Sequence, residues 1–205
     1  MGKAILLSTK PVWCEKMCNV IGHDEKFNLI YEKMVEIRKT RPKLETPFKV
    51  YIYCTNDKDM LWILKESERR RKIASIFTAK DVGGATKANG KVIGEFVCDS
   101  IRKISCTNNN EGVWLKSTAG EFILGMSALT HDEISSYLEN SSGYAWHISN
   151  LVIYDEPREL REFCKIGVCP CDAKSILHCT ENMSFCAKRN LIIAPQSWCY
   201  VEEIS

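Results

Sequence analysis

Short apolar and alternating segments recur along the chain and predict many strands. Residues 4–7 form an apolar run of strand type. Residues 34–39 alternate apolar and polar side chains, which is typical of a half-buried strand, and residues 48–54 are rich in aromatic and branched side chains. Three later segments have strand character as well, at residues 92–101, 144–154 and 198–201.

Helical patterns are fewer and are interspersed among the strands. Pro11 suits a first helical position, and Trp13, Met17 and Cys18 follow at helical spacing. Residues 130–133 form a capping-box pattern that predicts a helix start. A helix is also predicted over residues 57–76, and a short one after Pro157. The mixture predicts an α+β protein built on a curled sheet rather than a βαβ array.

Length and composition bound the protein class. A chain of 205 residues with 45% hydrophobic and 26% charged residues is typical of one globular domain. The net charge is only +2, so any affinity for phosphate has to come from local clustering. No apolar run approaches the ~20 residues that cross a bilayer, and the first residues lack a signal peptide's apolar core. We therefore expect a cytoplasmic protein with no membrane partner.

Cysteines are numerous, and some of them are clustered. The chain has 11, and a disulfide framework is not expected in a reducing compartment. Four closely spaced thiolates could order a loop-rich segment around zinc, whereas the alternative is free thiols. We predict a structural zinc held by Cys169, Cys171, Cys179 and Cys186, with Cys164 as the substitute ligand.

Five cations in eleven residues make up the densest basic stretch: Lys33, Arg38, Lys39, Arg41 and Lys43, with Glu36 among them. Guanidinium and ammonium groups donate to phosphate oxygens, so one interpretation is a nucleic-acid or nucleotide contact. The alternatives are a solvated edge strand protected by lysines, or a structural ion pair between Glu36 and Arg38.

Two further places combine aromatic and polar side chains. Lys10 precedes Trp13 at a predicted helix start, which suits a phosphate and a stacked base, although Trp13 could equally anchor the core. Trp146 and His147 lie in a predicted strand, where His147 is either a site group or a structural histidine. No phosphate loop or dinucleotide fingerprint is present, so no organic cofactor is expected.

Several of these segments together resemble bacterial and phage ASCH-domain proteins. Residues 3–14 (KAILLSTKPVWC) and 33–43 (KMVEIRKTRPK) look like the two opening motifs of that family. The resemblance continues in order through residues 48–54, 90–96, 144–149 and 195–201. It covers nearly the whole chain, and this order is more specific than any single motif.

The resemblance implies a PUA-like β-barrel with a few peripheral helices. The expected barrel covers residues 3–155 and is closed by a last strand near residues 197–203. The chain would then be a single domain over residues 1–205, with a cysteine-rich insertion at residues 164–190. Family members are proposed to bind RNA or modified nucleosides in a cleft. The ligand-binding residues would be Lys10, Trp13, Lys33, Glu36, Arg38, Lys39, Trp146 and His147.

The resemblance also implies an alternative function, because some small family members are amidohydrolases that act on N-acylated cytidine. In that subgroup a lysine and a threonine three residues later serve as base and nucleophile, in the stretch that matches residues 33–38. Lys33 keeps the lysine, whereas Glu36 takes the threonine's place and Met34 replaces a usual threonine. As an enzyme, the chain would use Lys33 as base and Glu36 to activate water.

Overall fold

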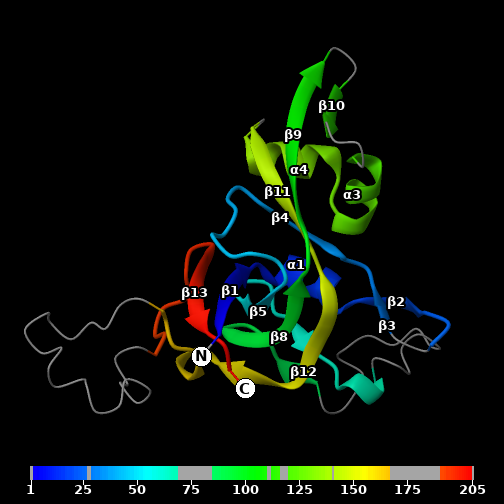
Figure 1. The fold of residues 1–205 in the computed structure, drawn as a ribbon. Helices are drawn as coiled ribbons and strands as arrows, with labels where there is room; N and C mark the ends of the chain where they lie inside the picture. The colour runs from blue at the N-terminus through cyan, green and yellow to red at the C-terminus, as the bar shows by residue number, and fades with distance from the viewer. Residues whose placement is uncertain are drawn as a thin grey trace, which may run out of the picture.

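The computed structural model describes residues 2–26, 29–68, 85–109, 112–115, 120–139, 141–166 and 190–204. A five-stranded sheet lies beside both chain ends (Figure 1). In spatial order it consists of β12 (Ser149–Glu159), β8 (Lys91–Cys98), β5 (Phe48–Cys54), β1 (Lys3–Thr9) and β13 (Trp198–Glu202). The predicted strands at residues 4–7, 48–54 and 198–201 are therefore confirmed.

A second sheet of four strands stands above the first in Figure 1. Its order is β10 (Gly112–Leu115), β9 (Ile101–Asn109), β11 (Ser142–His147) and β4 (Val35–Arg38). Two small ribbons complete the described strands, β2 (Val20–His23) with β3 (Leu29–Tyr31) and β6 (Trp62–Ile63) with β7 (Thr86–Lys87).

The expected closed barrel is wrong, because neither sheet closes within the described residues. The edges of the larger sheet are β12 and β13, which do not pair with each other, and those of the smaller sheet are β10 and β4. The last strand does pair antiparallel with β1, but as an edge strand. The protein is thus a strand-rich fold of two open sheets with a few helices.

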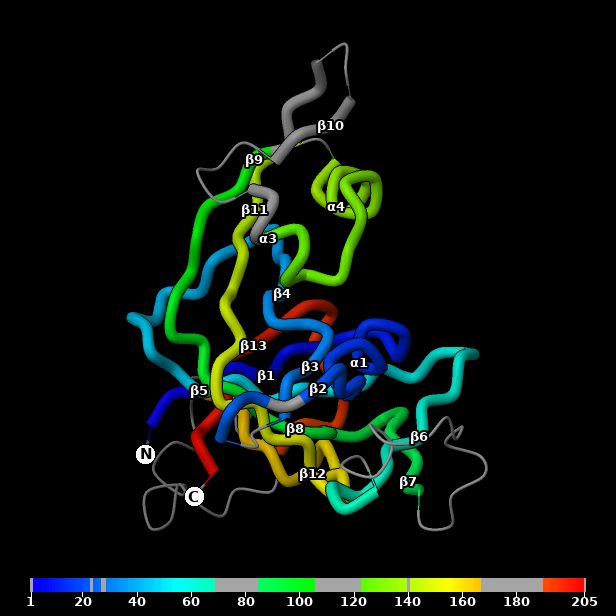
Figure 2. The backbone as a smooth tube through the Cα atoms, turned by 90° about the vertical axis from the view of Figure 1, so that its right-hand side faces the viewer, coloured from blue at the N-terminus to red at the C-terminus, as the bar shows by residue number. Residues whose placement is uncertain are grey.

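One bent ribbon of paired strands connects the two sheets. The predicted strand at residues 92–101 is interrupted at Asp99 and Ser100, where the chain leaves β8 and enters β9. The chain returns at Ile148, between β11 and β12. The ribbon pairs antiparallel on both sides of this bend, β8 with β12 and β9 with β11 (Figure 2).

Local sequence accounts for the helices that the structure describes. Pro11 opens α1 (Pro11–Cys18) as predicted, and α3 (Gly120–Ser127) and α4 (His131–Leu138) pack against the smaller sheet. The capping box of α4 is complete, since the Thr130 hydroxyl accepts from Glu133 N and the Glu133 carboxylate accepts from Thr130 N. The helix expected after Pro157 is a 3-10 turn, η2 (Leu160–Glu162). No helix among the described residues is long and apolar enough to cross a membrane.

The apolar run of β1 reflects a strand that is covered on both faces. Ile5 and Leu7 belong to the core that contains α1 and the aromatic side chain of Trp146. Ala4 and Leu6 face a second core on the other side of the sheet. Because both faces are buried, the strand has no polar alternation.

The predicted helix over residues 57–76 is wrong in its first part. Met60 and Trp62 are exposed, whereas Leu61, Ile63 and Leu64 are buried, so the segment alternates like a strand and forms β6. Leu61 N donates to Asn89 Oδ1 at 2.8 Å, and Leu61 O accepts from Ala88 N at 2.9 Å. Residues 66–68 are helical, and the remainder of the prediction lies outside the described residues.

Two glycine-to-alanine substitutions should have opposite effects on stability. A Cβ on Gly94 would collide with the Val152 carbonyl oxygen where β8 and β12 approach closely, so Gly94→Ala should lower the free energy of unfolding by about 1 to 3 kcal/mol. Gly125 lies exposed in α3 with nothing within 4 Å of an added Cβ, so Gly125→Ala should raise the free energy of unfolding by ~1 kcal/mol. Urea unfolding of both variants measures the difference, and equal effects would contradict the close approach.

Candidate functional site

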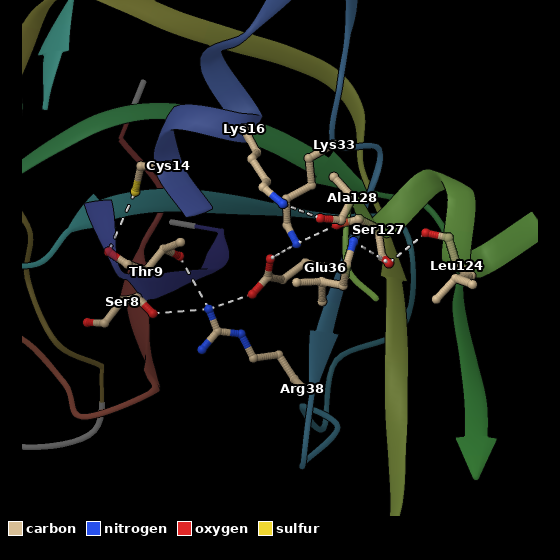
Figure 3. Close-up of polar contacts among 11 residues, drawn as sticks. Ser8, Thr9, Cys14, Lys16, Lys33, Glu36, Arg38, Leu124, Ser127 and Ala128 are labelled. Atoms are coloured by element: carbon tan, nitrogen blue, oxygen red, sulfur yellow. Dashed lines mark hydrogen bonds and ion pairs between the residues drawn. The ribbon is translucent and has the colours of Figure 1, made fainter. Parts of the chain in front are cut away.

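Three charged side chains meet where the two sheets approach each other: Lys33, Glu36 and Arg38 (Figure 3). Lys33 Nζ lies 3.3 Å from Glu36 Oε2, and Arg38 Nη2 lies 2.7 Å from Glu36 Oε1. The three residues are only 2%, 5% and 8% exposed. We call this cluster the buried triad.

The position of Lys33 explains how it reaches Glu36. In a strand, residues 33 and 36 would lie on opposite faces, but Lys33 precedes β4, which begins at Val35. The intervening Met34 is fixed by its backbone, since its N–H donates to Met126 O at 2.7 Å and its carbonyl accepts from Ile148 N at 2.9 Å. The strand end therefore directs Lys33 back towards the carboxylate.

Arg38 connects the smaller sheet to the larger one. Its Nη2 donates to Ser8 O at 3.0 Å and to Thr9 Oγ1 at 3.2 Å, at the end of β1. The prediction of a half-buried β4 is wrong, because all four of its residues are buried, including Glu36. Apolar neighbours cover one face of the strand, and on the other face Glu36 is paired with Arg38.

A second lysine and an aromatic ring border the triad. Lys33 Nζ donates to Ser127 O at 3.1 Å, and Lys16 Nζ donates to Ala128 O at 2.5 Å, after the end of α3 (Figure 3). Both ammonium groups lie over the half-buried Trp13 ring, at 5.7 and 5.0 Å from its centroid. Sequence reasoning missed Lys16, although its spacing of three from Trp13 is a signal that could have indicated it.

The charge balance of the triad is uneven. Burial by itself raises the pKa of Glu36, but Lys33 and Arg38 outweigh burial and hold this pKa below its ordinary value of 4.5. Glu36 is therefore ionised at neutral pH. One carboxylate faces two buried cations, so the triad has an excess positive charge, and Lys16 lies close by.

Three buried polar atoms in this region have no hydrogen-bond partner within the described part of the chain: Glu36 Oε2, Arg38 Nε and Trp146 Nε1. Glu36 Oε2 has its ion pair with Lys33, but without hydrogen-bond geometry. A buried polar group left unpaired typically costs about 1 to 3 kcal/mol. Such groups are uncommon in folded proteins and indicate a missing partner or a functional constraint.

The other predicted ligand-binding residues are distributed differently. Trp146 lies directly opposite Glu36 in the β4–β11 register, so the two share a face of the sheet. His147 lies opposite Val35 and points to the other face, where its Nδ1 lies 2.7 Å from Asp99 Oδ1. Lys10 is exposed at the start of α1. The structure thus unites Trp13, Lys33, Glu36, Arg38 and Trp146 around one region but separates His147 from them.

Lys39 also lies apart from the triad. It is exposed, and its Nζ pairs with Glu139 Oε1 at 2.6 Å after the end of α4. Lys39 is adjacent to Arg38 in sequence but belongs to a solvent-exposed ion pair. It therefore offers a matched control for charge removal.

Most of the predicted zinc site falls outside the described residues. Cys169, Cys171, Cys179 and Cys186 are not among them. The thiol of Cys164, the predicted substitute ligand, donates a hydrogen bond to Asn190 Oδ1 at 3.1 Å. No metal-ligating group of three or more side chains occurs within the described residues. The zinc site stays a prediction.

Comparisons with known proteins show a similarity of fold. No protein-family model and no curated protein matches the sequence. The chain is similar to a crystal structure of ASCH from Zymomonas mobilis, with a TM-score of 0.51 and 12% identity, over 98% of this chain and 88% of that one. A point variant of that protein gives a TM-score of 0.49 at 12% identity, over 98% of this chain and 92% of the other. The resemblance inferred from sequence is thus confirmed at the level of the fold.

Removing the carboxylate of the triad should destabilise the protein strongly. Glu36→Gln leaves two buried cations without a counter-charge, so the free energy of unfolding should fall by about 3 to 5 kcal/mol at pH 7. The pKa of Glu36 is lower in the folded protein than its ordinary value of 4.5. The ionised carboxylate therefore stabilises the folded state above pH 4.5, and this stabilisation is lost as the pH falls through the folded pKa. The variant should therefore lose less stability than the wild type on acidification.

Urea unfolding at several pH values measures both effects. Glu139→Gln is the control, because it removes the carboxylate of an exposed ion pair and should change the unfolding midpoint very little. Equal destabilisation by the two substitutions would contradict the burial of the triad.

Proposed function

We propose that this chain, whose fold is similar to that of ASCH, binds RNA or a modified nucleotide at the buried triad. The observation that carries the proposal is the excess positive charge of Lys33 and Arg38 over Glu36 in a nearly closed environment. Burying two cations beside a single carboxylate lowers the stability of the folded protein unless another negative group approaches them. A phosphate-bearing ligand would supply that group.

Aromatic and basic groups around the triad suit the rest of such a ligand. The Trp13 ring is half-buried, so part of it is open to contact, and a nucleobase can stack on an aromatic ring. Lys10 is exposed three residues before Trp13, where its charge can attract phosphate. A group that can attract an anion and a ring that can stack on a base therefore come from one short stretch of the chain, at the end of β1 and the start of α1.

The contacts of Lys33 favour binding over amide hydrolysis. A general base needs a free electron pair, whereas Lys33 Nζ donates to Ser127 O and faces the Glu36 carboxylate. Glu36, in turn, is shared between Lys33 and Arg38 rather than directed at a water. These contacts engage Lys33 in an ion pair and a hydrogen bond, so we place the binding function first.

Removing the excess positive charge should weaken ligand binding without removing the Glu36–Arg38 pair. Lys33→Met should lower the affinity for a short labelled single-stranded RNA by about tenfold, and should reduce the salt slope of log K by ~0.7 if one phosphate contact is lost. Fluorescence anisotropy at several salt concentrations measures both quantities.

Lys39→Met is the matched control, because it removes the same charge from an exposed ion pair. It should leave the affinity and its salt dependence close to those of the wild type. If both variants weaken binding equally, the RNA contacts the protein through general surface charge and the triad is not the site.

A further inference from the structure

Two exposed cations of the densest basic stretch lie outside the triad, in the loop that connects β4 to β5. Arg41 and Lys43 follow shortly after Arg38, and both are exposed. Pro42 between them is buried, and Leu44 packs against the core. Neither cation forms an ion pair within the described residues. The loop therefore directs two unpaired positive charges towards solvent.

Aromatic side chains of β13 hold this loop in place. The Tyr200 hydroxyl accepts from Lys43 N at 2.7 Å, and Trp198 Nε1 donates to the Thr40 hydroxyl at 3.0 Å. The Trp198 and Tyr200 rings pack edge to face with centroids 5.4 Å apart, and Trp198 packs against Trp146 at 6.2 Å. Because the loop is fixed before a ligand arrives, its charges can be matched with little loss of entropy.

The register of the smaller sheet extends the positive charge from the triad towards solvent. Tyr144 of β11 lies opposite Arg38 of β4 on one side and opposite Lys103 of β9 on the other, so the three side chains form one row. Arg38 is buried, Tyr144 is half-buried and Lys103 is exposed, without an ion pair in the described part of the chain. Trp146 lies two residues from Tyr144 and on the same face of β11, so this row lies beside the aromatic side chains that hold the loop.

We propose that these side chains form a surface for a single strand of RNA that extends outwards from the triad. This inference rests on the proposed function and names its partner, which is a strand of several nucleotides rather than a free mononucleotide. We call the surface the basic strip, and it consists of three exposed cations and three half-buried rings: Arg41, Lys43, Lys103, Tyr144, Trp198 and Tyr200. The cations donate to phosphates of the strand, and bases stack on the open parts of the rings.

The number of exposed cations favours a strand over a single nucleotide. One phosphate at the triad balances the excess charge of Lys33 and Arg38 over Glu36, but it leaves the charges of the basic strip unmatched. Glu45 is exposed in the same loop and offsets one of these charges. Further phosphates along a strand supply the remaining anions.

The rings of the basic strip favour single-stranded RNA over other polyanions. Every base has a face that can stack on an aromatic side chain, whereas the carboxylates of an acidic protein segment use only the cations. In a duplex the base faces are already stacked on one another, so the strand has to be single.

Two probes of different length test the inference: a labelled RNA of about eight uridine nucleotides, and uridine 5′-monophosphate. The double variant Arg41→Gln/Lys43→Gln should weaken binding of the longer RNA about tenfold and reduce the salt slope of log K by ~1.4, because two phosphate contacts are lost. Its affinity for the mononucleotide should stay within about twofold of the wild type, because one phosphate occupies the triad alone. Fluorescence anisotropy at several salt concentrations measures the first binding, and calorimetric titration measures the second.

Lys103→Gln tests whether the strand also crosses the smaller sheet, because Lys103 lies on β9 and not in the loop. Added to the double variant, this substitution should reduce the salt slope by a further ~0.7. All three substituted side chains are exposed, so the unfolding midpoint in urea should stay close to that of the wild type.

Lys58→Gln/Lys65→Gln is the matched control for charge removal. Both lysines are exposed and flank β6. The partner of β6 is β7, which contacts β12 at the edge of the larger sheet opposite β13. The control removes the same charge as the loop variant at a place far from the basic strip, so it should leave the affinity and the salt slope of the longer RNA unchanged.

The outcomes separate this inference from the proposed function. If the longer RNA depends on Lys33 but not on Arg41 and Lys43, or if the control variant weakens it equally, the basic strip is wrong and binding at the triad stands. If it depends on Arg41 and Lys43 but not on Lys33, the triad is not the site and the proposed function is overturned. An acidic peptide of equal charge that binds as tightly as the RNA would overturn RNA as the partner of the strip.

Discussion

The contact of Arg38 with Glu36 on one side and with Ser8 and Thr9 on the other is the interaction on which the rest of the structure depends. It joins β4 of the smaller sheet to the end of β1 in the larger sheet. Apart from this contact, the bent ribbon of β8, β9, β11 and β12 provides the continuous strand connection between the sheets. An arginine suits this connection because its guanidinium group carries several hydrogen-bond donors. These donors fix the orientation of β4 relative to β1, which apolar packing alone would not do.

The triad also determines which parts of the chain lie near one another around the candidate site. Lys33 reaches the carbonyl that ends α3, and Lys16 reaches the next one, so α1, β4 and α3 converge on the Trp13 ring. The cost of burying three charges is reduced by their pairing but not removed, because the charges are unequal in number. The same imbalance that makes the site expensive to fold makes it attractive to an anionic ligand.

The proposed nucleotide binding would depend on the charge and the burial of this region. The excess positive charge of the triad would act on phosphate without regard to base sequence. Burial strengthens this effect, because charges that water does not surround are screened less.

Periodicity, turn residues and capping residues were sufficient to predict β1, β5, β13, α1 and α4, because each of these elements is determined by neighbouring residues. The motif residues Lys33, Glu36 and Arg38 could be selected from charge density and family resemblance. The resemblance also grouped them in one cleft. Alternation by itself would separate residues 33 and 36, and the start of β4 at Val35 is what brings them together. Likewise, the sequence did not show that Trp146 and His147, adjacent in one strand, point to opposite faces with different partners.

Nor could the sequence show whether the strands would close into a barrel. Closure depends on which edge strands pair, and such long-range pairing is decided by tertiary packing rather than by local preference.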